Sequence, residues 1–142
     1  MIRLLIVDDH AVVREGLRLL FATVPGVEVV GMAADGAVAV DQARVLAPDV
    51  VLMDLGMPKM DGIEATRRIV ARDRDAKVVV LTSDPDEERM IAALKAGAIG
   101  YVLKHSDAAE VVRAVQAAYV GERVLDPAAG RVLAAREDCP PT

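Results

Sequence analysis

The sequence has few aromatic residues, a single cysteine and no long hydrophobic run. Only 2% of its 142 residues are aromatic, and tryptophan is absent. Because one cysteine, Cys139, cannot form an internal disulfide or a zinc site, we expect a reducing, cytoplasmic setting. The longest purely apolar runs hold about five residues, whereas a membrane-spanning helix needs about 20, so we expect no membrane interaction.

Positive charge is also in short supply. The chain has 17 lysines and arginines against 22 acidic residues, a net charge of -5. This balance argues against a free-standing nucleic-acid-binding protein. At about 150 residues per domain, the length predicts one domain with at most a short extension. A domain of that size buries about two thirds of its unfolded surface and can fold without disulfides or a structural metal.

Five short apolar runs recur along the chain, separated by longer segments with helical spacing. Three of the runs are apolar at nearly every position, which is typical of strands covered on both faces of a parallel sheet. In the intervening segments, apolar residues such as Val13, Leu17 and Leu20 step by four and three residues, as on one face of a helix. The predicted strands are Ile2–Val7, Val27–Ala33, Val50–Met53, Val78–Leu81 and Ile99–Leu103.

Strand and helix therefore alternate five times. Asp61 is placed to cap a helix, Pro48 marks a helix that has already ended, and Gly97 and Gly121 are typical helix-ending glycines. Right-handed crossovers then predict an α/β fold with a doubly wound, five-stranded parallel sheet. The common strand order for this flavodoxin-like class is 2-1-3-4-5.

Polar side chains follow the predicted strands at their carboxyl ends. Asp8 and Asp9 follow the first strand and Asp54 the third. These strands are neighbours where the winding direction reverses, so the three carboxylates should crowd together. Crowded carboxylates either take up protons or are joined by a cation, and hard oxygen ligands suit Mg²⁺. With Thr82 and Lys104 at the ends of the last two strands, the set predicts phosphoryl transfer to Asp54.

Four segments in this order and spacing resemble a response-regulator receiver domain. They are Leu5–His10, Asp54–Gly62, Leu81–Ser83 and Gly97–Lys104, and the resemblance covers residues 1–120. The first and last segments look most like the NarL/FixJ subfamily, whose members usually carry a LuxR-type helix-turn-helix output domain after the receiver. The resemblance implies a CheY-like fold and a signalling domain of a two-component system rather than an enzyme.

The resemblance also implies roles at the carboxylate pocket. Asp54 would accept a phosphoryl group from the phosphohistidine of a sensor histidine kinase. The carboxylates of Asp9 and Asp54 and the carbonyl of Gly56 would bind Mg²⁺, with Asp8 assisting through water. Phosphorylation would then control a DNA-binding output, and hence transcription.

Three further residues would connect phosphorylation to the surface of the domain. By the resemblance, Thr82 and Lys104 contact the phosphoryl oxygens, and Tyr101 is an aromatic switch that turns inward when Thr82 moves. The surface that responds would span about residues 86–120. A further expected partner is a second copy of the chain, in a homodimer that forms on phosphorylation.

Alternative interpretations stay open from the sequence. A haloacid-dehalogenase-like phosphatase also uses an aspartate nucleophile, Mg²⁺ and a lysine, but it needs Asp-x-Asp after the first strand, where this chain has Asp8 adjacent to Asp9. A stand-alone receiver that acts by protein–protein interaction is the other alternative. We interpret His10 and His105 as loop or cap residues rather than metal ligands.

Residues 121–142 look like a linker. Asp126 and Pro127 are suited to begin a short helix over Ala128–Arg136, and the Pro-containing end that follows is typical of a connector. This segment resembles the connection to an output domain, cut before that domain begins. Because it contains no basic recognition helix, we expect DNA binding only through an output domain outside this chain.

Overall fold

A computed structural model describes residues 1–57, 60–83, 86–104 and 107–125 of the chain. Six strands form one parallel sheet in the order β2-β1-β3-β4-β5-β6. The strands are β1 (Ile2–Val7), β2 (Val27–Ala33), β3 (Val50–Asp54), β4 (Lys77–Thr82), β5 (Gly100–Leu103) and β6 (Val124–Leu125). The helices are α1 (Ala11–Ala22), α2 (Gly36–Leu46), α3 (Gly62–Arg72), α4 (Glu87–Ala96) and α5 (Ala108–Tyr119).

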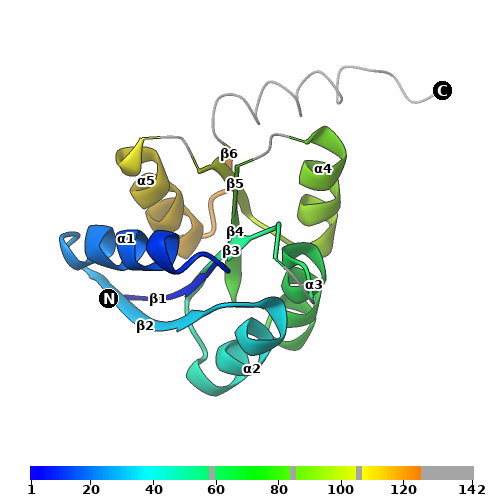
Figure 1. Cartoon of the computed structure of the whole chain (residues 1–142), viewed down its shortest axis with the longest axis horizontal. Helices are drawn as coiled ribbons and strands as arrows, with labels where there is room; N and C mark the ends of the chain where they lie inside the picture. Colours follow the sequence, from blue (N-terminus) through cyan, green and yellow to red (C-terminus); the bar gives the residue numbers. More distant parts are fainter. Residues whose placement is uncertain (58–59, 84–85, 105–106, 126–142) are drawn as a thin grey trace.

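Helices cover both faces of the sheet, α1 and α5 on one side and α2, α3 and α4 on the other (Figure 1). Each face has its own apolar core. Phe21 and Val115 pack on the face under α1 and α5, and Ile69 and Met90 pack on the opposite face. Because the central strands contact helices on both sides, every residue of β3 is buried. This explains why the strand sequences are apolar without alternation.

The predicted strand order 2-1-3-4-5 is confirmed, but the prediction of five strands is wrong. A sixth strand, β6, lies within the segment predicted as a linker and pairs with the start of β5, where Gly100 is opposite Val124. The amide of Val124 donates to the carbonyl of Ile99 at 3.2 Å. This pairing satisfies backbone groups that the edge of β5 would otherwise leave open. The rest of the predicted linker, with its short helix, lies outside the described residues.

Helix ends follow the predicted signals. The side chain of Asp61 accepts a hydrogen bond from the amide of Glu64 and caps α3. Gly97 ends α4 with φ 116°, a left-handed conformation that favours glycine. At the start of α3, a Cβ added to Gly62 would overlap the carbonyl oxygen of Asp54, so glycine lets this helix approach the end of β3. Within the described part, no helix is long and apolar enough to cross a membrane.

Candidate functional site

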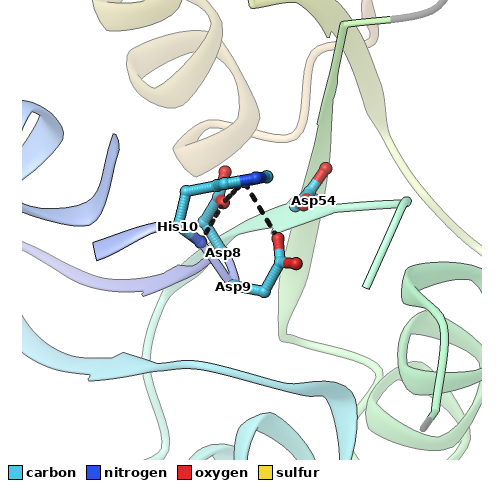
Figure 2. A group of neighbouring side chains, drawn as sticks. All are labelled: Asp8, Asp9, His10 and Asp54. Atoms are coloured by element: carbon cyan, nitrogen blue, oxygen red, sulfur yellow. Dashed lines mark hydrogen bonds and ion pairs between the residues drawn. The ribbon is translucent and has the colours of Figure 1, made fainter. Parts of the chain in front are cut away.

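The carboxyl ends of β1 and β3 bring the predicted aspartates together. The two strands are adjacent and Val7 lies opposite Met53, so Asp8 and Asp54 each follow a paired residue. Potential ligand atoms of Asp8, Asp9, His10 and Asp54 all lie within 4.8 Å of one another. Figure 2 shows these four side chains close together.

Burial shapes the electrostatics of this pocket. The side chains of Asp8 and Asp54 are only 1% and 6% exposed, whereas that of Asp9 is 26% exposed. Burial raises the pKa of Asp54, and the neighbouring charge of Asp8 raises it further. The ammonium of Lys104 and the amide of Gly56, which donates to Asp54 Oδ1 at 3.3 Å, offset part of this increase in pKa.

Lys104 reaches the pocket from the end of β5. Its Nζ lies 2.6 Å from Asp8 Oδ2 and 3.4 Å from Asp54 Oδ1. Burial lowers the pKa of Lys104, but its hydrogen bonds and charge interactions with the two aspartates outweigh burial and raise the pKa overall. Lys104 is therefore a cation at neutral pH. The pocket holds three carboxylates, and this ammonium contacts two of them, which leaves negative charge for a second cation to neutralise.

His10 belongs to this cluster as well as to the helix start. It is the N-cap residue of α1 and its side chain is 66% exposed, as expected for a cap residue. Its Nδ1 also lies 3.2 Å from Asp8 Oδ1 and 3.1 Å from Asp9 Oδ1, contacts that the sequence interpretation did not include. The amide of His10 donates to Asp8 Oδ1 at 2.9 Å, which helps to hold that carboxylate in place.

Thr82 and Tyr101 lie on the same face of the sheet. Thr82 is the last residue of β4, lies opposite Leu103 and is 4% exposed. Tyr101 lies opposite Val80, two residues before Thr82, and is 1% exposed within the core under α3 and α4. The two proposed switch residues are thus neighbours on adjacent strands, with the tyrosine ring turned inward.

Arg89 is a residue near the site that the sequence interpretation missed. From α4, its guanidinium donates to the carbonyl of Leu55 at 2.9 Å. Leu55 directly follows Asp54, so α4 is connected to the loop beside the candidate nucleophile. No motif or periodicity points to this bond, because a backbone carbonyl accepts it.

The donor set fits Mg²⁺. All three aspartates supply hard oxygen atoms, and Mg²⁺ prefers one or two carboxylates together with phosphate oxygens and water. Gly56 follows Asp54 by two residues, is exposed, and has open space where a side chain would lie. Water and a phosphoryl group therefore have access to this side of the pocket.

Comparison with known proteins agrees with this geometry. The family model for the response regulator receiver domain matches residues 4–116. The chain therefore belongs to the response regulator receiver domain family, which is a class of signalling domains in two-component systems. The predicted resemblance is confirmed, and the match argues against the haloacid-dehalogenase-like alternative.

Relatives of the chain are named as transcriptional regulatory proteins and response regulators. The transcriptional regulatory protein LiaR of Bacillus subtilis is 48% identical over 94% of this chain and 64% of LiaR. The response regulator UvrY of Escherichia coli is 42% identical over 88% of this chain and 57% of UvrY. The chain thus spans less than two thirds of the length of these relatives.

Solved structures of response regulators have the same fold. A LuxR-family two-component response regulator from an Aurantimonas species superposes with a TM-score of 0.92 at 40% identity, covering 97% of this chain and 99% of that one. The RcsB response regulator of Salmonella typhimurium superposes with a TM-score of 0.88 at 26% identity, covering 94% of this chain and 70% of that one.

Proposed function

We propose that this chain is the phosphorylation-switched receiver of a response regulator, and that Asp54 accepts a phosphoryl group from the phosphohistidine of a sensor histidine kinase in a Mg²⁺-dependent reaction. The observation that carries this proposal is the position of Asp54. It is buried at the end of β3, within 4.8 Å of the other carboxylates and 3.4 Å from a lysine ammonium. Burial of a carboxylate costs free energy in either protonation state. Few structural roles for an aspartate in this setting would offset that cost.

In the proposed step, a carboxylate oxygen of Asp54 attacks phosphorus in line with the P–N bond of the phosphohistidine. The new P–O bond forms as the P–N bond breaks, and the electron pair of that bond goes to the imidazole nitrogen of the kinase, which water then protonates. The ammonium of Lys104 faces Asp54 and neutralises charge on the incoming phosphoryl oxygens.

The pocket would hold Mg²⁺ through the carboxylates of Asp9 and Asp54 and the carbonyl of Gly56, with Asp8 assisting through water. When bound, Mg²⁺ supplies positive charge against the phosphoryl oxygens. The buried carboxylate of Asp8 is already paired with Lys104, which suits a supporting role rather than a direct one.

Phosphorylation would act on the remainder of the protein through Thr82 and Lys104. A phosphoryl group adds charge and acceptor oxygens, so it would pull both side chains towards Asp54. The resemblance implies that Tyr101 turns inward when Thr82 moves, but its ring is already buried on the same face as Thr82. By this proposal, phosphorylation would therefore fix Tyr101 in the inward position instead of moving it there. The responding surface would include α4, β5 and α5, and it would favour a homodimer.

We further propose that this receiver controls a LuxR-type DNA-binding output and hence transcription. The longer relatives support this proposal, since their names describe transcriptional regulators and the chain matches only part of each. RcsB, a structural neighbour, has been solved as dimers bound to DNA. By this proposal the 142-residue chain does not itself bind DNA, and it works in the cytoplasm.

The nucleophile can be tested with a small phosphoryl donor. Incubation with acetyl phosphate and Mg²⁺ should add one phosphoryl group per chain, measured by intact mass, and removal of Mg²⁺ with EDTA should prevent it. Asp54→Asn should abolish the addition. Asp41→Asn, an equal change at an exposed position on α2, is the matched control and should react normally. Phosphorylation of the Asp54→Asn variant would contradict the assignment, and repeated hydrolysis of phosphate monoesters would indicate a phosphatase.

A further inference from the structure

A second cavity lies at the amino edge of the sheet, opposite the edge that carries Asp54. Its volume is about 250 Å³, and it is formed where α3 and α4 end and where β4, β5 and β6 begin. Three cationic side chains line it, those of Arg74, Lys77 and Arg123. Among the described residues that line this cationic cavity, none is acidic.

Unlike most of the basic residues on the described surface, these three cations have no partner for an ion pair or a side-chain hydrogen bond. Elsewhere, several arginines on helices pair with a glutamate three residues earlier, as in Arg18 with Glu15, Arg67 with Glu64 and Arg113 with Glu110. In the described part of the chain, no ion pair or side-chain hydrogen bond involves Arg74, Lys77 or Arg123.

Acidic neighbours in the sequence do not neutralise this cluster. Asp73 and Asp75 flank Arg74, but the carboxylate of Asp73 accepts a hydrogen bond from the amide of Asp75 instead. The chain as a whole carries a net charge of -5, so a basic composition does not explain why three cationic side chains line one cavity. Three cations that share one cavity without a carboxylate form a positive potential suited to an anion.

The floor of the cavity is apolar. Val70 of α3, Leu94 of α4 and Ile99 before β5 supply aliphatic side chains, and Ala76 and Ala98 are buried beside them. Ligand sites combine apolar walls with a few convergent polar groups, and most are larger, at about 300–1,000 Å³. The size of this cavity therefore favours a small ligand.

We propose that the cationic cavity binds a small organic phosphate. The phosphate group would contact Arg74, Lys77 and Arg123, because guanidinium groups donate two parallel hydrogen bonds to phosphate oxygens. The apolar part of the ligand would lie against Val70 and Leu94. The site is separate from the phosphoacceptor pocket, so this proposal does not depend on the function proposed for Asp54.

Phenylphosphonate is a suitable probe because its C–P bond cannot transfer a phosphoryl group to Asp54. Titrated into the ¹⁵N-labelled 142-residue chain, it should shift the amide signals of Lys77, Gly97 and Ile99, and added salt should weaken its binding. Arg74→Ala and Arg123→Ala should each weaken the binding about tenfold, since each removes charge-assisted hydrogen bonds. Both arginines are exposed, so the variants should keep the fold, which circular dichroism checks.

Arg72→Ala is the matched control. It removes the same charge from the last turn of α3, but Arg72 does not line the cationic cavity. If the three cations serve only to complement the carbonyl ends of α3 and α4, no amide in the cavity will shift and the proposal is overturned. Equal weakening by Arg72→Ala, or shifts confined to the Asp54 pocket, would overturn it as well. Equal affinity for methylphosphonate would refute the role of the apolar floor.

Discussion

Lys104 is closer to Asp8 than to the candidate nucleophile Asp54. The distance from its Nζ to Asp8 Oδ2 is 2.6 Å, against 3.4 Å to Asp54 Oδ1. Because Asp8 is 1% exposed, this ammonium is the main compensation for a buried negative charge. Lys104 therefore supports the folded domain as well as the proposed chemistry, and a substitution should affect both.

We expect Lys104→Met to destabilise the domain by about 3 kcal/mol when Mg²⁺ is absent, because removal of one partner leaves Asp8 buried and unpaired. Urea unfolding in EDTA measures this change. Lys95→Met, on the exposed surface of α4, is the control and should change the unfolding free energy by less than about 0.5 kcal/mol. If Asp8→Asn is already present, the Lys104 substitution should cost much less. Equal costs in both backgrounds would show that the pair contributes little.

The sequence predicts the clustering of Asp8, Asp9 and Asp54 well because topology decides it. The apolar runs suffice to place β1 and β3. Because these strands are adjacent and parallel, the residues at their carboxyl ends lie close together. The sequence does not predict that Lys104 lies closer to Asp8 than to Asp54. A difference of 2.6 Å against 3.4 Å depends on side-chain packing, not on topology. The two-residue strand β6 was missed because Val124 and Leu125 are too short a run to show a period. The Arg89 contact was missed because its acceptor is a backbone group.

Arg89 should stabilise the loop that follows Asp54. Its guanidinium donates to the Leu55 carbonyl, whose only other hydrogen bond in the described residues is a longer one, 3.3 Å, from the amide of Gly62. We expect Arg89→Ala to lower the unfolding free energy by about 1–2 kcal/mol. It should also weaken Mg²⁺ binding several-fold, because Gly56 lies on the same loop.

Calorimetric titration with Mg²⁺ and urea unfolding together check this prediction. Lys95→Ala, on the same helix, is the control for loss of one positive charge. A loss of stability with unchanged Mg²⁺ affinity would mean that Arg89 does not position the metal-binding loop.

The pH dependence of stability should report the raised pKa of Asp54. Because its pKa is higher in the folded chain than in the unfolded chain, the unfolded chain loses this proton first as the pH rises. The free energy of unfolding should therefore decrease as the pH rises from about 3.8 through the raised pKa, and then stay level.

Asp54→Asn should remove this decrease, since asparagine does not titrate. In EDTA the variant should be more stable than the parent at pH 7, and the difference should shrink as the pH falls through the raised pKa of Asp54 towards 3.8. Urea unfolding over a pH series measures it, with Asp41→Asn as the control for loss of one negative charge. A difference of the opposite sign at pH 7 would show that Asp54 is stabilised as an anion in the apo protein.

The end of α2 offers a test of backbone strain away from both sites. Ala47 is the C-cap residue, with φ 47° and ψ 58°, and in the described residues no other non-glycine residue has a positive φ. The guanidinium of Arg3 donates to the carbonyls of Leu46 and Ala47 at 2.6 and 3.0 Å. Those contacts involve backbone oxygens, so they do not depend on the side chain at position 47.

We expect Ala47→Gly to stabilise the domain by about 0.5–1 kcal/mol. A left-handed conformation costs an L-residue roughly 1–2 kcal/mol, and the greater freedom of glycine in the unfolded chain offsets about half of that relief. Ala43→Gly, in the interior of the same helix, is the matched control and should destabilise by about 1 kcal/mol. Urea unfolding measures both changes. If the two substitutions destabilise equally, the backbone at Ala47 is not left-handed in solution, and α2 ends in a different C-cap conformation.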